Sequence, residues 1–311
     1  MAALALFVFF AITAGGNGFL TPLGTSGWVD TASEIGVIAI PVAALLIAGE
    51  FDLSIGAVVA ASSMTTAIAT THYGLPIWLS IAMAIGLGAV VGAINGYITL
   101  RTGVGSFIVT LAMLMALTGL TLGFSRLLSG TTSISIESDG LAHALFAGEI
   151  GPFSATLGWW LLIGAVATWV LFRTVFGSWV YATGGDLESA KMNGVPVRRV
   201  KRTLFICSSM GAALIGVLQT LQFNGADTSR GSSFVFSAIA AAVIGGVLLT
   251  GGYGSPIGVS LGAITYGVVS SGIYYTGWST DWVQLFLGAL VLLAVLMNNY
   301  FRKLALSSGG S

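Results

Sequence analysis

Residues 77–99 read IWLSIAMAIGLGAVVGAINGYIT and contain no charged residue. A helix needs roughly 20 predominantly apolar residues to cross the hydrocarbon core of a bilayer, so this stretch is long enough to span one. It lacks the strict alternation that membrane-barrel strands show. Because backbone groups in lipid must be hydrogen-bonded within their own segment, the stretch predicts a transmembrane helix.

The same pattern recurs along the whole chain, between boundaries of Gly, Pro or charged residues. It gives ten apolar runs, at residues 2–14, 35–49, 55–71, 77–99, 107–124, 157–176, 203–221, 234–250, 257–276 and 283–300. Of the 311 residues, 56% are hydrophobic and only 7% are charged, against roughly 25% charged in soluble domains. We predict an all-α polytopic membrane bundle of about ten transmembrane helices.

The ten runs form a single transmembrane domain over residues 1–306. Residues 307–311, SSGGS, have the composition of a linker and are predicted to form a flexible tail. An even number of crossings puts both ends of the chain on one side of the membrane. Two segments on the opposite side, residues 15–34 and 125–156, are long enough to carry structure of their own.

The basic residues decide the orientation, because cytoplasmic loops carry an excess of Lys and Arg. With both termini in the cytoplasm, only Arg126 and Arg230 lie outside, and the cytoplasmic set is Arg101, Arg173, Lys191, Arg198, Arg199, Lys201, Arg202, Arg302 and Lys303. The carboxylates do not contradict this orientation, since most fall outside: Asp30, Glu34, Glu137, Asp139, Glu149, Asp227 and Asp281. We therefore expect a multi-pass protein of the bacterial inner membrane with both termini cytoplasmic.

Several classes of function are excluded or disfavoured by what the sequence lacks. A net charge of zero gives no support to nucleic-acid binding. His72 and His143 have no second ligand at metal spacing, and Cys207, which lies in an apolar run, is predicted to be a small buried hydrophobe. There is no Gly-x-x-x-x-Gly-Lys-Ser/Thr motif to hold nucleotide phosphates. We expect this chain to bind no metal or cofactor and to have no enzymatic activity of its own.

The longest cytoplasmic segment contains a pattern of a different kind. Residues 181–202 read YATGGDLESAKMNGVPVRRVKR. Asp186 is a good helix N-cap, residues 187–192 suit a short helix, and Asn193-Gly194 would end it. The basic run then leads into the next span. This pattern predicts a short amphipathic helix on the cytoplasmic face, of the kind that fits a groove on a partner protein.

The segment resembles the cytoplasmic coupling loop of the ribose-type ABC sugar permeases, which reads tyrosine-alanine-x-glycine-glycine, an acidic or polar pair, alanine, then x-x-glycine-isoleucine or valine. Three further stretches are similar to that family and occur in its order: GEFDLSIG at 49–56, SFIVTL at 106–111, and AIAAAVIGG at 238–246 leading to GGYGS at 251–255. Together they cover residues from about 20 to 300. Glu50 departs from the pattern, because the family usually has glycine there.

The resemblance implies a function and a set of partners. The chain would be the permease subunit of an ATP-driven importer, with ATP and Mg²⁺ held by separate ABC ATPase subunits. A second permease copy or close paralogue and an external solute-binding protein would complete the assembly in the lipid membrane. The loop at 177–202 would dock on the ATPase, and the residues that transmit its motion would be Gly185, Asp186, Glu188, Ala190, Gly194 and Val195.

Two sets of polar residues are candidates for the transport site itself. Asp52 and Ser54 offer N-caps at the start of a span and mark a helix break, a feature of substrate paths in many transporters. A sugar also needs hydrogen-bonding groups along its path. The candidates, polar in apolar surroundings, are Asn95, Thr110, Gln219, Gln222, Asn224, Ser270, Ser271 and Tyr274. Satisfied contacts between helices are the alternative interpretation of these positions.

Three alternatives remain open at this point. A branched-chain amino-acid ABC permease has a related fold, but the spelling of the motifs favours the sugar branch. An ion-coupled secondary carrier would need charged residues within the spans, and the predicted spans offer no strong candidate. A purely structural membrane subunit would have no cavity. Nothing in the sequence names the solute.

Overall fold

The computed structural model, which describes residues 2–137 and 140–308, is built almost entirely of helices. The long helices are α2 (Pro22–Ile47), α4 (Ile77–Thr102), α5 (Ser106–Ser129), α7 (Ala155–Arg173), α10 (Val197–Gln222), α12 (Pro256–Thr276) and α13 (Trp282–Ser308). The shorter helices are α1 (Ala2–Ala14), η1 (Gly15–Asn17), α3 (Ile55–Thr71), α6 (Gly140–Phe146), α8 (Val175–Gly185), α9 (Leu187–Met192) and α11 (Phe234–Ile244). The strands are β1 (Ser133–Ser135), β2 (Glu149–Ile150), β3 (Phe153–Ser154) and β4 (Gly225–Asp227).

Each of the ten predicted apolar runs contains a helix, although the run at 234–250 is helical only as far as Ile244. Within the described residues, six helices are long and apolar enough to cross a membrane, namely α2, α4, α5, α7, α10 and α12. The apolar runs in α1, α3 and α11, and the apolar part of α13 over Trp282–Asn298, form shorter apolar helices. The helical membrane bundle is thus confirmed, and the count of ten crossings stays a prediction.

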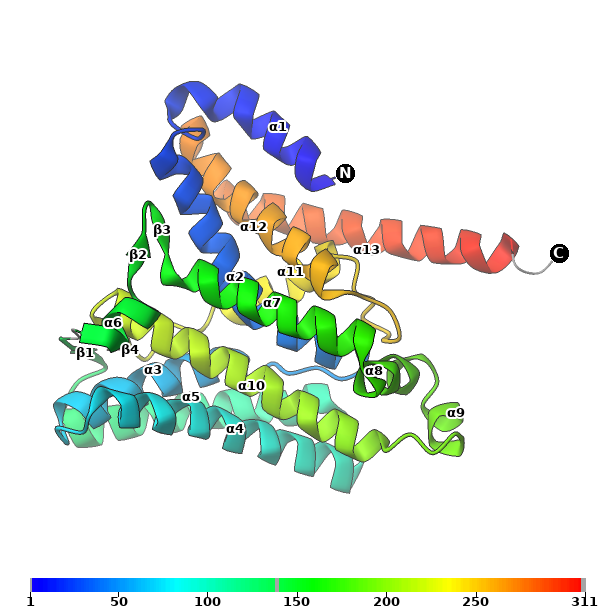
Figure 1. Ribbon diagram of the computed structural model, residues 1–311, viewed down its shortest axis with the longest axis horizontal. Helices are drawn as coiled ribbons and strands as arrows, with labels where there is room; N and C mark the ends of the chain where they lie inside the picture. The colour runs from blue at the N-terminus through cyan, green and yellow to red at the C-terminus, as the bar shows by residue number, and fades with distance from the viewer. Residues whose placement is uncertain (1, 138–139, 309–311) are drawn as a thin grey trace.

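Helices α4, α5, α7 and α10 run in roughly the same direction across Figure 1, whereas α2 runs more steeply. The strands and α6 gather at one end of these helices, and α8 and α9 lie at the other (Figure 1). At the first end, β1 pairs antiparallel with β4 and β2 pairs with β3. The segment at 125–156, predicted to carry structure, does so. We call the end with α8 and α9 the α9 end; its assignment to the cytoplasm remains a prediction from charge.

The predicted boundary between the outside segment at 15–34 and the next apolar run is wrong, because α2 already begins at Pro22. Thr21 caps the helix by accepting a hydrogen bond from the backbone N–H of Gly24 at 3.1 Å. The first half of α2 carries polar side chains, so it does not form part of an apolar run. Asp30 accepts hydrogen bonds from the backbone N–H and hydroxyl of Ser154, and Glu34 accepts one from Gln219 at 3.0 Å. Both carboxylates are therefore satisfied inside the protein.

Glycines allow α4 and α10 to pack closely. A Cβ atom added at Gly92 would lie 2.4 Å from the carbonyl oxygen of Phe205, and one at Gly88 would lie 2.7 Å from that of Ser209. Such distances leave no room for any other residue. Close packing of small residues substitutes in membranes for the hydrophobic drive that lipid does not provide. This contact fixes the position of α10 relative to the rest of the bundle.

Some residues of the predicted tail and of the outside segment at 125–156 are not described by the structure. Helix α13 continues to Ser308, so it includes the first two residues of the predicted flexible tail. Residues 309–311 of that tail, and Asp139 in the other predicted outside segment, lie outside the described residues.

Candidate functional site

A non-helical segment, residues 48–54, separates α2 from α3 and is held by side chains of the surrounding helices. The backbone N–H of Phe51 donates to the Ser106 hydroxyl at 3.0 Å, and that of Leu53 donates to the Thr110 hydroxyl at 3.1 Å. Asn95 donates through its amide nitrogen to the Ser54 hydroxyl at 2.8 Å. Non-helical backbone at membrane depth is tolerated only where protein surrounds it and supplies such partners. The predicted helix break is present, and α4 and α5 hold it.

Asp52 ties the segment to α10. Its Oδ1 atom accepts hydrogen bonds from the backbone N–H of Ser54 at 3.0 Å and from the Ser54 hydroxyl at 2.6 Å. Its Oδ2 atom accepts from the hydroxyls of Ser208 at 2.9 Å and Ser209 at 3.2 Å. Asp52 and Ser54 are both buried. The prediction that they cap α3 is wrong: Ser54 precedes the helix without a side-chain capping bond, and Asp52 binds α10 instead.

A second link joins the same two elements by charge. Lys201 of α10 forms an ion pair with Glu50, the residue at which the sequence departs from the ribose-type pattern. The side chains are only 10% and 13% exposed, respectively. The extra carboxylate is therefore compensated by a lysine, at the end of α10 that follows the coupling loop.

The predicted coupling helix is present with its predicted bounds. Asp186 precedes α9 and accepts hydrogen bonds from the backbone N–H groups of Glu188 and Ser189, both at 3.0 Å, and from the Ser189 hydroxyl at 2.7 Å. These bonds, the one from the Ser189 side chain foremost, lower the pKa of Asp186 below its ordinary value. The helix ends where Gly194 takes a positive φ of 76° and the N–H of Val195 donates to the carbonyl of Ala190.

The outer face of α9 combines charge with two apolar side chains. Met192 is 86% exposed, and Leu187 at the other end of the helix is also exposed. Glu188 and Lys191 form a solvent-exposed ion pair between them. Ala190 is buried beneath. Met192 was not among the predicted coupling residues.

A backbone junction connects α8 to two other segments of the bundle. A Cβ atom at Gly184 would lie 1.7 Å from the carbonyl oxygen of Ile47 and 2.7 Å from the nitrogen of Gly252. The N–H of Gly252 donates to the Ile47 carbonyl at 2.8 Å. Tyr181 donates through its hydroxyl to the carbonyl of Gly254 at 2.8 Å. The last turns of α2 and α8 and the 250–254 loop are thereby in direct backbone contact, which we call the glycine junction.

The glycine junction also brings together the two similar motifs at 49–56 and 251–258. A Cβ atom at Gly251 would lie 3.1 Å from Cα of Gly49, and both residues have a positive φ, 84° and 81°. Glycine adopts this conformation at no steric cost, unlike other residues. The two motifs therefore meet at the α9 end.

The predicted substrate-path residues fall in three separate places. Asn95 and Thr110 are fully buried against the 48–54 segment. Gln219, Gln222 and Asn224 lie at the opposite end of α10, where Gln219 is buried, Gln222 is half-buried and Asn224 is exposed. Ser270, Ser271 and Tyr274 lie on α12, with the serines half-buried and the tyrosine exposed. No contact places the three groups together, and their role in the path stays a prediction.

The group at the end of α10 contains charged residues that sequence reasoning placed in loops. Gln219 donates to Glu34, and the Arg230 guanidinium donates to the backbone carbonyls of Gln219 and Gly225. The guanidinium also lies 5.1 Å from the ring centre of Phe223. This cluster joins α2, α10 and the β4 segment, so Glu34 is a half-buried carboxylate within a candidate span rather than a loop residue.

Two further observations concern Cys207 and possible metal ligands. Cys207 is exposed, which corrects the prediction that it is buried. Within residues 2–137 and 140–308, no group of three or more His, Cys, Asp and Glu residues could hold a metal ion.

Comparison with known families identifies the class of protein that has these features. Residues 24–295 match the model of the family described as branched-chain amino acid transport system / permease component. The chain belongs to this family. The matched region contains the 48–54 segment, the glycine junction and α9.

Curated relatives extend along nearly the whole permease and carry sugar names. The chain is 33% identical to the L-arabinose ABC transporter permease protein AraH of Azospirillum brasilense, over 97% of this chain and 87% of that protein. It is 31% identical to the fructose import permease protein FrcC of Rhizobium meliloti, over 95% and 83% respectively. It is 28% identical to the ribose import permease protein RbsC of Escherichia coli K12, over 95% and 92%. No solved structure matches the chain. The resemblance to ribose-type sugar permeases is confirmed.

Proposed function

We propose that this permease is the membrane-spanning subunit of an ATP-driven ABC importer that moves a small sugar or sugar-like solute by alternating access. Separate ABC ATPase subunits would bind ATP and Mg²⁺, and this chain would bind no cofactor. A second permease copy or a close paralogue would complete the membrane part, and a solute-binding protein would deliver the solute. The inner membrane is the location that such a subunit requires.

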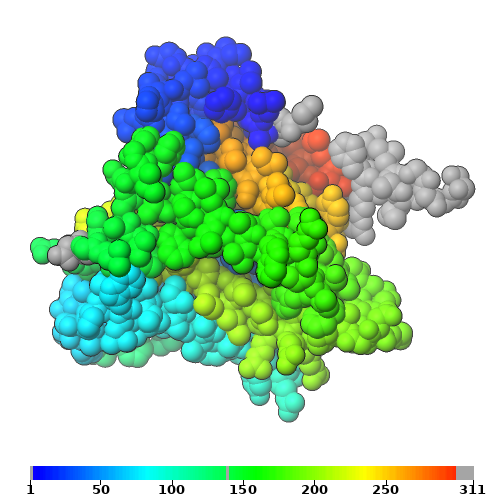
Figure 2. Space-filling view, in the orientation of Figure 1, coloured from blue at the N-terminus to red at the C-terminus, as the bar shows by residue number. Residues whose placement is uncertain are grey.

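The observation that carries the proposal is the exposed helix α9 with its rigid attachment to the bundle. Figure 2 shows the green segment of α8 and α9 on the surface at one end of the molecule. An 86% exposed Met192 beside the Lys191–Glu188 pair suits an amphipathic helix that enters a groove on a partner. Asp186 and Gly194 fix both ends of that helix. The partner's force would thus act on a preformed element.

Two routes would carry the force inward. Through α8, movement of α9 reaches the glycine junction, where Gly184 contacts Ile47 and Gly252 without intervening side chains. Through α10, it reaches the 48–54 segment by way of the Lys201–Glu50 ion pair and the serine bonds to Asp52. Rigid, contiguous contacts of this kind can carry coupling between distant sites. Both routes end on the same helix break between α2 and α3.

A sugar is the favoured solute class because the curated relatives include permeases named for arabinose, fructose and ribose. An amino-acid solute, suggested by the family's description, is the alternative. An ion-coupled carrier is the other alternative. Glu34 would offer such a carrier a half-buried carboxylate within a candidate span. A structural role is sufficient to explain it, because Glu34 accepts a hydrogen bond from Gln219, whose carbonyl binds Arg230.

A docking variant tests the function directly. Met192→Glu places a charge where an apolar contact is expected, and should abolish co-purification of the ATPase and ATP-dependent uptake. The matched control is Leu141→Glu on α6, an exposed apolar residue on a short helix at the opposite end. It should leave ATPase co-purification unchanged. Unchanged ATPase binding in Met192→Glu would remove α9 from this role, and ion-driven uptake by the reconstituted chain alone would favour the carrier.

A further inference from the structure

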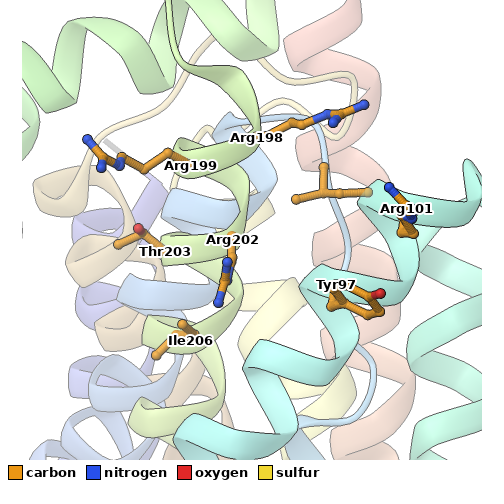
Figure 3. Close-up of a pocket in the computed structure, with 8 residues that line it drawn as sticks. Tyr97, Arg101, Arg198, Arg199, Arg202, Thr203 and Ile206 are labelled. Carbon is orange, nitrogen blue, oxygen red and sulfur yellow. The ribbon is translucent and has the colours of Figure 1, made fainter.

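A cationic groove lies between the end of α4 and the start of α10. It encloses about 520 Å³ and is lined by Tyr97, Leu100, Arg101, Arg198, Arg199, Arg202, Thr203 and Ile206. In Figure 3, Arg198 extends toward α4, where Arg101 lies, while Arg202 lies between the two helices and Arg199 points to the other side. Four arginines thus line one opening, with Arg199 directed away from α4, and no carboxylate is among the lining residues.

These arginines have no partner to neutralise them. In the described part of the chain, none of the four guanidinium groups forms an ion pair, since the two pairs present are Lys191–Glu188 and Lys201–Glu50. The groove also opens beside the first turn of α10, whose N-terminal end carries partial positive charge. Like charges so close together repel one another. An anion in the groove would relieve that repulsion.

The groove continues into an apolar wall along both helices. Arg198, Arg202 and Ile206 follow one another at intervals of one turn on α10, so Arg202 lies roughly 6 Å deeper than Arg198. One turn beyond the lining residues, Ile94 of α4 and Met210 of α10 are exposed and apolar. A ligand that fits must therefore carry negative charge at one end and hydrocarbon at the other.

We propose that this groove binds an anionic phospholipid of the leaflet at the α9 end, with its phosphate groups among the arginines and its acyl chains along Ile94 and Met210. The planar guanidinium matches phosphate geometry through paired hydrogen bonds. Basic pockets between membrane helices are suited to phospholipid headgroups, and those with several cations to the diphosphate headgroup of cardiolipin. Arg101, Arg198 and Arg202, on the side toward α4, carry more positive charge than a single phosphate neutralises, which favours the diphosphate of cardiolipin over lipids with one phosphate.

The position of the site gives the lipid a place in the coupling route. Arg198 and Arg199 follow α9 after a short turn, and Lys201, which pairs with Glu50, lies between them and Arg202. Figures 1 and 2 both show the end of α4 beside the start of α10 at the edge of the molecule. A lipid that bridges α4 and α10 here would hold the start of α10 against the bundle. The leaflet assignment rests on the proposed orientation, whereas the groove does not.

A second groove provides an internal comparison. It lies between α7 and α12, encloses about 860 Å³, and has Arg173 as its sole charged lining residue among aromatic and aliphatic side chains that include Trp169 and Phe172. A neutral lipid tail satisfies such a surface. We expect this larger groove not to select anionic lipids, because one guanidinium gives little preference.

Native mass spectrometry of the detergent-purified chain, titrated with cardiolipin or phosphatidylcholine, tests the proposal. The wild-type protein should retain cardiolipin preferentially. Each arginine near the membrane surface is worth about fivefold in affinity, so Arg198→Gln with Arg202→Gln should weaken cardiolipin binding about 25-fold. The control Arg173→Gln should change it by less than about twofold. Circular dichroism of each variant checks that the helices remain folded.

Several results would overturn the proposal. These are equal retention of the two lipids, an equal loss in Arg173→Gln, or no loss in the double variant. Millimolar inorganic phosphate should not displace cardiolipin, and if it did, the apolar wall would contribute nothing. Release of the lipid when the ATPase binds would assign the groove to that protein instead.

Discussion

The buried ion pair between Lys201 and Glu50 allows a quantitative test of the structure. Lys201→Met removes the cation and leaves the Glu50 carboxylate 13% exposed without its partner, and Glu50→Gln does the reverse. Breaking a buried pair from one side costs about 3 to 5 kcal/mol, because the remaining charge keeps its desolvation penalty. Since each side chain retains about a tenth of its exposure, the expected loss for each variant is about 2 kcal/mol.

Removal of both charges should cost less than removal of either one. Replacing a buried pair by uncharged side chains of similar volume is often neutral. We expect Glu50→Gln combined with Lys201→Met to lose about 1 kcal/mol, against about 4 kcal/mol for the sum of the single variants. The difference, about 3 kcal/mol, is the coupling energy of the double-mutant cycle.

The assay is equilibrium unfolding of the purified chain in mixed micelles, titrated with sodium dodecyl sulfate and followed by circular dichroism. The matched control is the exposed pair of α9, Lys191 with Glu188, where Lys191→Met should cost less than about 1 kcal/mol. If the two single losses simply add in the double variant, or if Lys201→Met resembles Lys191→Met, the pair does not link α10 to the 48–54 segment.

Further predictions concern the glycine junction, the serine bonds and the cap of α9. Gly184→Ala should destabilise the fold and uncouple ATP hydrolysis from uptake, because its Cβ would lie 1.7 Å from the Ile47 carbonyl oxygen, whereas Gly185→Ala meets no atom within 4 Å; equal unfolding midpoints for the two would contradict the junction. Asp52→Ala should lower the free energy of unfolding by about 3 kcal/mol, since it leaves buried donors unpaired, and Asp52→Asn should lower it less; the unfolding titration measures both. Because hydrogen bonds lower the pKa of Asp186 below 3.8, its contribution to α9 is present above about pH 4 and is lost as the pH falls through that lowered pKa; amide hydrogen exchange of Glu188 and Ser189 should accelerate at low pH relative to the intrinsic rate, and unchanged protection would contradict the cap.

Local patterns in the sequence were sufficient for the helices and for the coupling loop. A run such as 77–99 is a helix because lipid offers no other partner for its backbone, and this constraint does not depend on neighbours. The same holds for α9, where Asp186 and Gly194 set both ends through bonds within a few residues. Features that could not be predicted depend on hydrogen-bond partners that are distant in the sequence. The start of α2 was missed because Asp30 and Glu34 are satisfied by Ser154 and Gln219, which lie far along the chain.

What the sequence by itself determined is a helical membrane protein with a short helix at 187–192, because apolar length and local capping are properties of short segments. Only the tertiary structure decided what Asp52, Glu50 and Gly184 do. Each depends on an atom of a remote segment: a serine hydroxyl on α10, the ammonium group of Lys201, and the carbonyl oxygen of Ile47. A buried polar group or a backbone contact acquires its energy from the partner that folding brings to it, and that partner cannot be identified from the residues on either side.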